Sequence, residues 1–156
     1  MLIVWNIIEE NANVDSIRGS PLFLAPDQFQ NLPITNSVDV YSFGVSILAY
    51  FIKDFGKHLP SLDLPPQFQH EPFFSRIIRG ARFVRPIHIP DAYWNLYREC
   101  TDPDPLKRPR FQDLATRFEK SPELLLPGTN IEEYKAYIEK MKKQNEEATE
   151  RYYENV

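Results

Sequence analysis

The sequence is poor in cysteine and contains no long hydrophobic run. Its single cysteine, Cys100, excludes an internal disulfide, so nothing in the sequence indicates an oxidising compartment. Because Trp94 and Leu96 are close to it along the chain, we interpret Cys100 as a small core residue rather than a nucleophile. No uninterrupted stretch reaches the roughly 18 apolar residues that a membrane span needs, so a membrane is not an expected partner.

A basic stripe and a targeting segment are also missing. The formal net charge is -4, with 18 Lys and Arg against 22 Asp and Glu, so nucleic acid is not an expected partner. The apolar run at residues 1–8 has no basic residue, is interrupted by Asn6 and leads into Glu9 and Glu10. This pattern is not typical of a secretory signal, and we expect a cytoplasmic protein.

The composition is that of about one globular domain, with 156 residues of which 42% are hydrophobic and 26% are charged. Glycine is scarce, at 5 residues, whereas proline is abundant, at 14. Because proline is excluded from helix interiors and central strands, this balance predicts helices joined by stiff, extended connectors. Residues 2–8 are rich in β-branched and aromatic types and predict one short strand, and the polar residues 9–20 predict a loop.

The segment 37–52 differs from its surroundings because it carries a single charge, Asp39. Its apolar residues fall on all sides of a helical wheel, which predicts a central helix buried on every face. Asn36 or Ser37 can cap this helix, and Asp39 lies in the first turn, where a carboxylate interacts favourably with the helix dipole. Gly56 follows the expected end of the helix and is suited to a C-terminal cap.

Three shorter helices are expected further along the chain. Residues 73–79 predict a short amphipathic helix that Gly80 ends, and residues 91–100 predict a second, with Asp91 as its N-cap. A third follows Pro109, which fits its first turn. Its apolar residues recur at i, i+3, i+4 and i+7 and are Phe111, Leu114, Ala115 and Phe118.

The C-terminal part of the sequence predicts a short linker at residues 121–128 and then one more helix. Residues 129–132 match a capping box, with Thr129 as the capping residue. The apolar stripe of this helix consists of Ile131, Tyr134, Ile138 and Met141. From Lys142 to Glu150 charges replace the stripe, so we expect a solvated or frayed end. The expected organisation is a domain at 1–120, the linker, and a helix with a polar tail at 129–156.

Three segments, in this order, resemble the C-terminal lobe of the protein kinases. Residues 19–27, Gly-Ser-Pro-Leu-Phe-Leu-Ala-Pro-Asp, resemble the end of an activation segment, which usually closes in Ala-Pro-Glu. Residues 37–45 resemble the start of the family's buried central helix, and residues 100–111 resemble the turn before its last helix. The Arg-Pro and Ile-Pro-Asp strings between them also fit the tyrosine-kinase-like group. The resemblance covers roughly residues 15–120.

This resemblance implies a mainly α fold, namely a helical C-lobe of the protein-kinase-like fold that is truncated at its front, with at most a short N-terminal strand. It also implies an ion pair between Asp27 and Arg108, although Asp27 is one methylene shorter than the usual Glu. In the family, the acidic residue at the position of Asp39 bonds to the backbone of the catalytic loop. That loop is missing here, so a role for Asp39 in capping and dipole stabilisation alone stays open.

The resemblance further implies a loop that binds a protein substrate. The stretch before Ala25 lacks the basic residue and Trp of tyrosine-specific relatives, so the chain resembles a Ser/Thr-directed kinase. Ser16 and Ser20 fall where relatives are phosphorylated in the activation loop, although an ordinary loop serine is the alternative at position 20. The residues assigned to the substrate loop by resemblance are Gly19, Ser20, Pro21, Leu22 and Phe23.

Phosphoryl transfer needs a Gly-rich loop, a Lys–Glu pair, a catalytic Asp and carboxylate or amide ligands for Mg²⁺. The sequence contains none of these in a fitting position, so we assign no catalytic, cofactor-binding or metal-binding residue. The string Asp54-Phe55-Gly56 matches the metal-binding triplet of kinases. We reject it because it follows the Ala-Pro-Asp motif instead of preceding it, and because it fits the last turn and cap of the 37–52 helix.

The functional hypothesis from the sequence is therefore the C-lobe of a Ser/Thr protein kinase whose parent enzyme uses ATP and Mg²⁺, with this chain catalytically incomplete. A non-catalytic, pseudokinase-like module that binds a partner protein is the alternative, and a degenerate product without function is a third. Whether Met1 is the true start stays open at this point.

Overall fold

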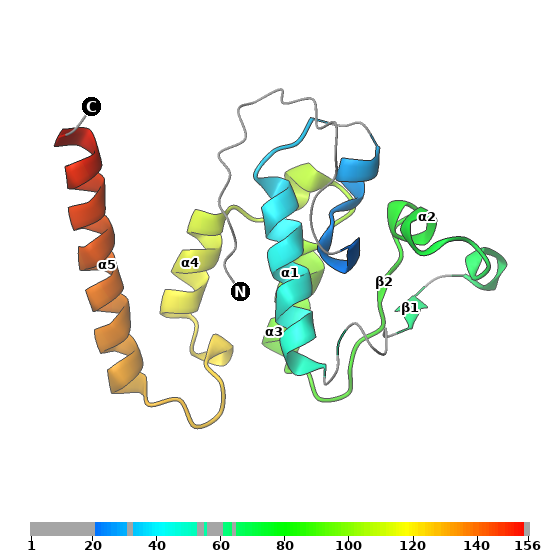
Figure 1. The fold of residues 1–156 in the computed structure, drawn as a ribbon. Coiled ribbons are helices and arrows are strands. Elements are labelled where there is room, and N and C mark those ends of the chain that lie inside the picture. Colours follow the sequence, from blue (N-terminus) through cyan, green and yellow to red (C-terminus); the bar gives the residue numbers. More distant parts are fainter. Residues whose placement is uncertain (1–20, 31–32, 53–54, 56–60, 64, 155–156) are drawn as a thin grey trace. The chain divides into compact units, whose positions relative to one another are not determined.

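The computed structural model describes residues 21–30, 33–52, 55, 61–63 and 65–154. The chain divides into two compact units, Met1–Phe111 and Gln112–Val156, which are described separately. The mainly helical fold expected from the sequence is confirmed, with five α-helices in the described part of the chain (Figure 1). The expected strand at 2–8 and loop at 9–20 lie outside the described residues.

Helix α1, Ser37–Phe51, is the centre of the first unit, and seven of its fifteen residues are buried. The prediction that it is buried on every face is wrong, because Asp39 is exposed and Tyr50 retains 71% of its accessible surface. These two residues are eleven positions apart, close to three helical turns, so they lie on the same side of α1. One side of the central helix is therefore exposed to solvent near both ends of the helix.

The ends of α1 also differ from the prediction. Asn36 makes no capping hydrogen bond with its side chain. Instead, the Thr35 hydroxyl accepts a hydrogen bond from the Ser37 amide at 3.3 Å. The helix ends at Phe51, so Phe55 is not part of its last turn, and the expected cap Gly56 lies outside the described residues.

Helix α3, Asp91–Cys100, packs against α1 through the close approach of Gly44 to Cys100. A Cβ atom on Gly44 would lie 2.6 Å from the Cβ atom of Cys100, so only glycine permits this distance. Cys100 is fully buried, as expected for a core residue. The N-cap of α3 is Pro90, and Asp91, the predicted cap, forms an ion pair with Arg85 instead.

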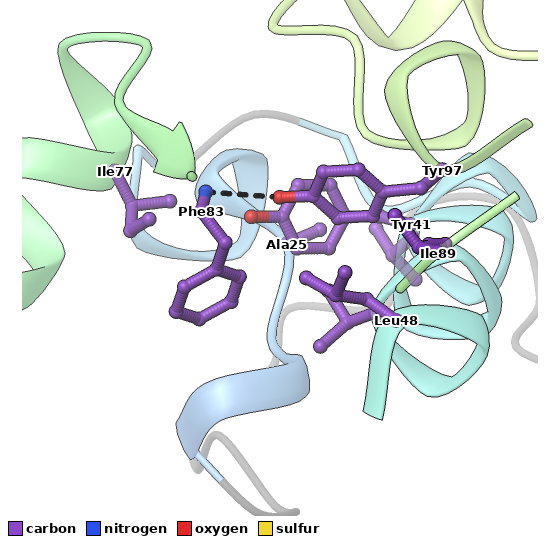
Figure 2. Close-up of a cluster of buried hydrophobic side chains, with 9 residues drawn as sticks. Ala25, Tyr41, Leu48, Ile77, Phe83, Ile89 and Tyr97 are labelled. Atoms are coloured by element: carbon purple, nitrogen blue, oxygen red, sulfur yellow. Dashed lines mark hydrogen bonds between the residues drawn. The ribbon is translucent and has the colours of Figure 1, made fainter. Parts of the chain in front are cut away.

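The core of the first unit surrounds the inner side of α1 (Figure 2). At its centre, the Tyr97 hydroxyl accepts a hydrogen bond of 3.1 Å from the Phe83 amide. Burial raises the pKa of Tyr97 to about 12, because the charged tyrosinate is disfavoured away from water. The buried members of the cluster are Ala25, Val38, Tyr41, Val45, Leu48, Ile77, Phe83, Ile89 and Tyr97.

The connector between α1 and α3 contains a short helix and a small antiparallel ladder. Helix α2, Phe73–Ile78, is followed by Gly80 at a φ of 95°, a conformation that favours glycine and explains the predicted stop. Strands β1, Leu62–Asp63, and β2, Arg82–Phe83, pair with Leu62 opposite Phe83. The sequence analysis did not predict this ladder.

Five of the fourteen prolines begin a 3-10 helix, as their fixed φ angle favours. Each of the five described turns of this kind starts with proline, and they span Pro21–Phe23, Pro26–Phe29, Pro66–Phe68, Pro105–Lys107 and Pro122–Leu124. The abundance of proline is thus accommodated in the connections between α-helices. Helix α4, Phe111–Lys120, starts two residues after Pro109, so the expected place of Pro109 in its first turn is wrong.

The second unit contains most of α4 and the long helix α5, Ile131–Glu154. The cap of α5 is Asn130 and not Thr129: the Asn130 side chain accepts hydrogen bonds from the amides of residues 132 and 133, at 3.1 and 3.3 Å. The Thr129 hydroxyl bonds to the Leu126 carbonyl instead. None of the helices in the described part of the chain combines the length and apolarity needed to cross a membrane.

Candidate functional site

A buried ion pair joins the first and the last of the three kinase-like segments, residues 19–27 and 100–111. The guanidinium of Arg108 donates two hydrogen bonds to the carboxylate of Asp27, at 3.0 Å from Nη1 to Oδ2 and 2.5 Å from Nη2 to Oδ1. The side chain of Arg108 is fully buried, and that of Asp27 is 5% exposed. A bidentate pair of this kind fixes orientation as well as distance, so the shorter Asp side chain still reaches both nitrogens.

The same guanidinium also reaches two backbone carbonyls. Arg108 Nη1 donates to the Ser37 carbonyl at the start of α1, and Nε donates to the Asp102 carbonyl after α3, each at 3.0 Å. Arg108 thus holds together the Ala-Pro-Asp turn, the start of the central helix and the loop after α3. Removing it would leave the buried carboxylate of Asp27 without its counter-charge.

Tyr41 of α1 lies beneath this site and contacts two guanidinium groups. The Cζ atoms of Arg108 and Arg82 lie over its ring, at 5.1 and 5.4 Å from the ring centroid. Burial raises the pKa of Tyr41, while the two nearby arginines act in the opposite direction. The ring is therefore kept neutral and serves as an aromatic surface for both cations.

Arg82 is a residue of this site that the sequence analysis missed. Its Nε donates to the Thr101 carbonyl at 2.6 Å, and its Nη1 donates to the carbonyls of Ile77 and Ala81 at 3.1 and 2.7 Å. These acceptors are backbone atoms, so no side-chain pattern in the sequence points to them. Arg82 links β2 to the end of α2 and to the loop after α3.

The expected substrate loop is described only in its second half. Pro21–Phe23 forms a 3-10 turn, and the Phe23 carbonyl accepts a hydrogen bond of 2.8 Å from the Ser42 hydroxyl of α1. The Phe23 ring also meets the Phe55 ring edge-on, with centroids 5.8 Å apart. The remaining predicted residues of this loop and the predicted phosphorylation sites, Ser16, Gly19 and Ser20, lie outside the described residues.

Asp39 lies in the first turn of α1, where the sequence predicted it. Within the described residues its carboxylate makes no hydrogen bond, and partial burial raises its pKa. The charged form of Asp39 is therefore less favoured than in water, despite the helix dipole.

The arrangement is suited to positioning a backbone segment and not to moving a proton or an electron pair. Arg108 and Arg82 are both stacked on Tyr41, and their hydrogen bonds end on the carboxylate of Asp27 and on backbone carbonyl groups. Among the residues that the structure describes, no three His, Cys, Asp or Glu side chains are grouped so that they could hold a metal ion.

Comparison with known proteins identifies the family. The sequence profile of the protein tyrosine and serine/threonine kinase family matches residues 8–118. This match covers well over half of the chain, and the chain therefore belongs to the protein kinase family. The resemblance inferred from the sequence motifs is confirmed.

Relatives among characterised kinases match over part of their length. The human dual serine/threonine and tyrosine protein kinase is 38% identical over 98 residues, which cover 60% of this chain and 10% of the relative. The mast/stem cell growth factor receptor Kit of Canis lupus familiaris is 31% identical over 98 residues, 63% of this chain and 9% of the relative. The dual specificity protein kinase shkA of Dictyostelium discoideum is 28% identical over 128 residues, 80% of this chain and 22% of the relative. The chain thus spans about a tenth to about a fifth of these relatives, and no solved structure matches it significantly.

Proposed function

We propose that this chain is the C-lobe portion of a Ser/Thr protein kinase and that it anchors the loop that binds the protein substrate. The observation that carries the proposal is the buried Asp27–Arg108 pair, which ties the turn after that loop to α1 and to the segment before α4. The Ser42 bond to the Phe23 carbonyl supports the same role, because it holds the loop from a second point on α1.

In this proposal the chemistry belongs to the whole kinase domain. ATP and Mg²⁺ would be bound by a Gly-rich loop, a Lys–Glu pair and the catalytic-loop residues, which are absent from the present sequence. This chain would supply a rigid helical base that keeps the substrate hydroxyl in line with the γ-phosphate. Positioning of that kind contributes much of the rate in phosphoryl transfer, so a loosened anchor would lower activity without touching the phosphate.

The preference for Ser and Thr rests on the loop sequence. The stretch Pro21-Leu22-Phe23-Leu24 contains neither the basic residue nor the Trp that tyrosine-specific relatives place there, and Ser20 occupies the Ser/Thr position. Two relatives carry names that indicate dual specificity, so tyrosine is the competing acceptor. The specificity of the site is therefore tested with serine and with tyrosine as the phosphate acceptor.

The experiment begins with the natural product that contains this segment. The intact mass of the native protein and the 5′ end of its transcript define that product, which is then assayed with two peptides that differ only in Ser or Tyr at the acceptor position. We expect Mg²⁺-dependent transfer of the γ-phosphate to the Ser peptide. Preferential labelling of the Tyr peptide would contradict the assignment of specificity.

A second candidate function is a non-catalytic module that binds a partner protein. The open side of α1 favours it, because Asp39 and the 71% exposed Tyr50 lie on one side of a helix whose opposite side is buried. Mg²⁺–ATP distinguishes the candidates. If the native product starts at Met1, shows no nucleotide-dependent thermal shift and transfers no phosphate, the binding module replaces the kinase proposal. For the 156-residue chain alone we expect no such shift.

A further inference from the structure

Helix α5 has a heptad pattern that extends beyond the apolar stripe recognised in the sequence. The spacing of 3 and 4 that starts at Ile131 continues past Met141 without interruption to the last turns of the helix. In the heptad notation of coiled coils, the a positions hold Ile, Ile, Asn and Tyr, and the d positions hold Tyr, Met and Ala. The seven residues are Ile131, Tyr134, Ile138, Met141, Asn145, Ala148 and Tyr152.

The structure leaves both ends of this face of α5 exposed, whereas Tyr134, Ile138 and Met141 in its middle are half-buried. None of the residues 131–152 is buried, and Ile131 and Tyr152, both at a positions, retain 53% and 68% of their accessible surface. Within the second unit, α4 reaches α5 through Tyr134, whose hydroxyl donates to the Phe118 carbonyl at 2.6 Å, and through Lys142. These contacts fall at d and e positions, and the a and g positions other than Ile138 are exposed. Long helices draw most of their stability from packing of an amphipathic face, and α5 lacks a buried one.

The charges of α5 are arranged around the seam in a way that permits self-pairing. All seven glutamates occupy b, c and f positions, and none lies at an e or g position beside the seam. In a parallel pair of α5 helices, Tyr137 at g meets Lys142 at e of the other copy, and Gln144 meets Thr149. No two like charges therefore face each other across the seam.

Asn145 indicates the partner and its direction. A single Asn at an a position, here following the β-branched Ile131 and Ile138, favours a parallel two-stranded coiled coil, because the two amides hydrogen-bond to each other. Within the described part of the chain, the Asn145 side chain is exposed and makes no hydrogen bond. In an antiparallel pair, a positions pack against d positions and e positions flank e positions, so the two Asn145 amides would not meet and lysines would face each other.

We propose that α5 is a self-association helix, and that two copies of this chain pair through residues 131–152 in a parallel, two-stranded coiled coil. Ile131, Ile138 and Asn145 form successive layers with their own equivalents. The pairing is independent of the kinase assignment, since it uses only the second unit. It gives the chain a dimeric form in which both copies of the first unit are attached at the same end of the coil.

The test is sedimentation equilibrium of the full chain from low micromolar to several hundred micromolar concentration. We expect the average mass to rise from that of one 18.4 kDa chain towards twice that value. Ile138→Glu is expected to abolish the rise, whereas the matched control Lys143→Glu, at an f position on the same helix, is expected to leave it unchanged. A mass that stays at one chain throughout would overturn the proposal, as would a dimer that Ile138→Glu does not affect.

A second variant keeps the test independent of any effect of Ile138→Glu on the monomer. Asn145→Leu replaces an exposed residue and removes the polar layer, so it should tighten association by about tenfold or more and admit higher oligomers. Ile131→Cys should form an inter-chain disulfide under mild oxidation, because parallel helices bring the two positions together. In an antiparallel pair those positions would lie at opposite ends of a helix about 36 Å long, and failure to cross-link would overturn the parallel arrangement. Lys143→Cys is the matched control and should not cross-link.

Discussion

The two units of the chain reach their order by different means. In Met1–Phe111, a close helix pair, a buried aromatic cluster and a desolvated ion pair constrain one another. In Gln112–Val156, a 24-residue helix exposes most of its surface and contacts its neighbour through a hydroxyl and an ammonium group. The first unit is specified by its interior, whereas the second keeps an incomplete interface. Substitutions should therefore have large and coupled effects in the first unit and small, local effects in the second.

Among the substitutions considered, Arg108→Ala should lower the stability of the first unit the most. It leaves the carboxylate of Asp27 buried without a counter-charge and frees the carbonyls of Ser37 and Asp102, so we expect a loss of about 3–5 kcal/mol of unfolding free energy. Urea denaturation followed by near-ultraviolet circular dichroism measures it. Arg98→Ala, on the exposed side of α3, is the matched control and should change stability by less than about 0.5 kcal/mol.

A double-mutant cycle with Asp27→Ala measures the interaction energy between the two side chains, apart from the effect that each substitution has alone. Because the two side chains share both hydrogen bonds, the combined variant should be less destabilised than the sum of the single variants, with a coupling of about 0.5–3 kcal/mol. Additive effects would mean that the pair does not exist in solution, and the anchoring role of Asp27 would be abandoned.

Gly44→Ala should have the next largest effect. The new Cβ atom would lie 2.6 Å from the Cβ atom of Cys100, so α1 and α3 must move apart, at a cost of about 1–3 kcal/mol. Chemical denaturation measures the change. Cys100→Ala keeps the opposing Cβ atom and should not relieve the clash, whereas Cys100→Gly removes it and should recover part of the loss. Equal behaviour of the two second-site variants would contradict the proposed close contact.

Tyr97→Phe tests the hydrogen bond at the centre of the core. It leaves the Phe83 amide buried without an acceptor, for which we expect a loss of about 1–3 kcal/mol. The wild-type pKa of about 12 lies above the value of about 10 of an unfolded tyrosine. The contribution of the neutral phenol is therefore complete below pH 10 and is lost as the pH rises towards 12.

Thermal unfolding between pH 8 and 12 measures this pH dependence. The wild-type protein should lose stability between pH 10 and 12, and the loss should be smaller in Tyr97→Phe. Tyr137→Phe, on the exposed side of α5, is the control and should follow the wild-type curve. If Tyr97→Phe and the wild-type protein lost stability in parallel, Tyr97 would not be the buried group that titrates.

Parts of this arrangement were predictable from the sequence, for physical reasons that differ from residue to residue. The uniform apolar character of residues 37–52 located α1, and Gly80 located the end of α2, because both signals are local. Asp27 and Arg108 were paired through family resemblance. Composition and spacing do not link residues 81 positions apart. Arg82 was missed because its acceptors are carbonyl groups that every residue carries, and β1–β2 was missed because a ladder of two residues has no measurable period.

The helix ends were the least predictable features. Asn36, Thr129 and Asp91 all have suitable side chains for an N-cap, yet none of them caps its helix in the expected way. A capping residue is chosen by the backbone angles at the entrance of the helix, and adjacent polar residues such as Thr129 and Asn130 compete for the same place. Sequence alone does not decide between two such neighbours, but their substitution does.

Asn130→Ala should have the smallest effect on the whole chain and the most localised one. It removes the acceptor for two amides at the start of α5, so we expect a local loss of about 1 kcal/mol and a lower helix content at 222 nm. The unfolding transition of the first unit should not move, because the described residues of its core cluster all belong to that unit. Thr129→Ala is the matched control, and it should reduce helix content less, since its hydroxyl bonds to the Leu126 carbonyl outside the helix. If Thr129→Ala reduced the helix content more than Asn130→Ala, Thr129 would be the capping residue in solution. A shift of the first unit's transition with Asn130→Ala would show that the two units unfold together, which would remove the contrast between them.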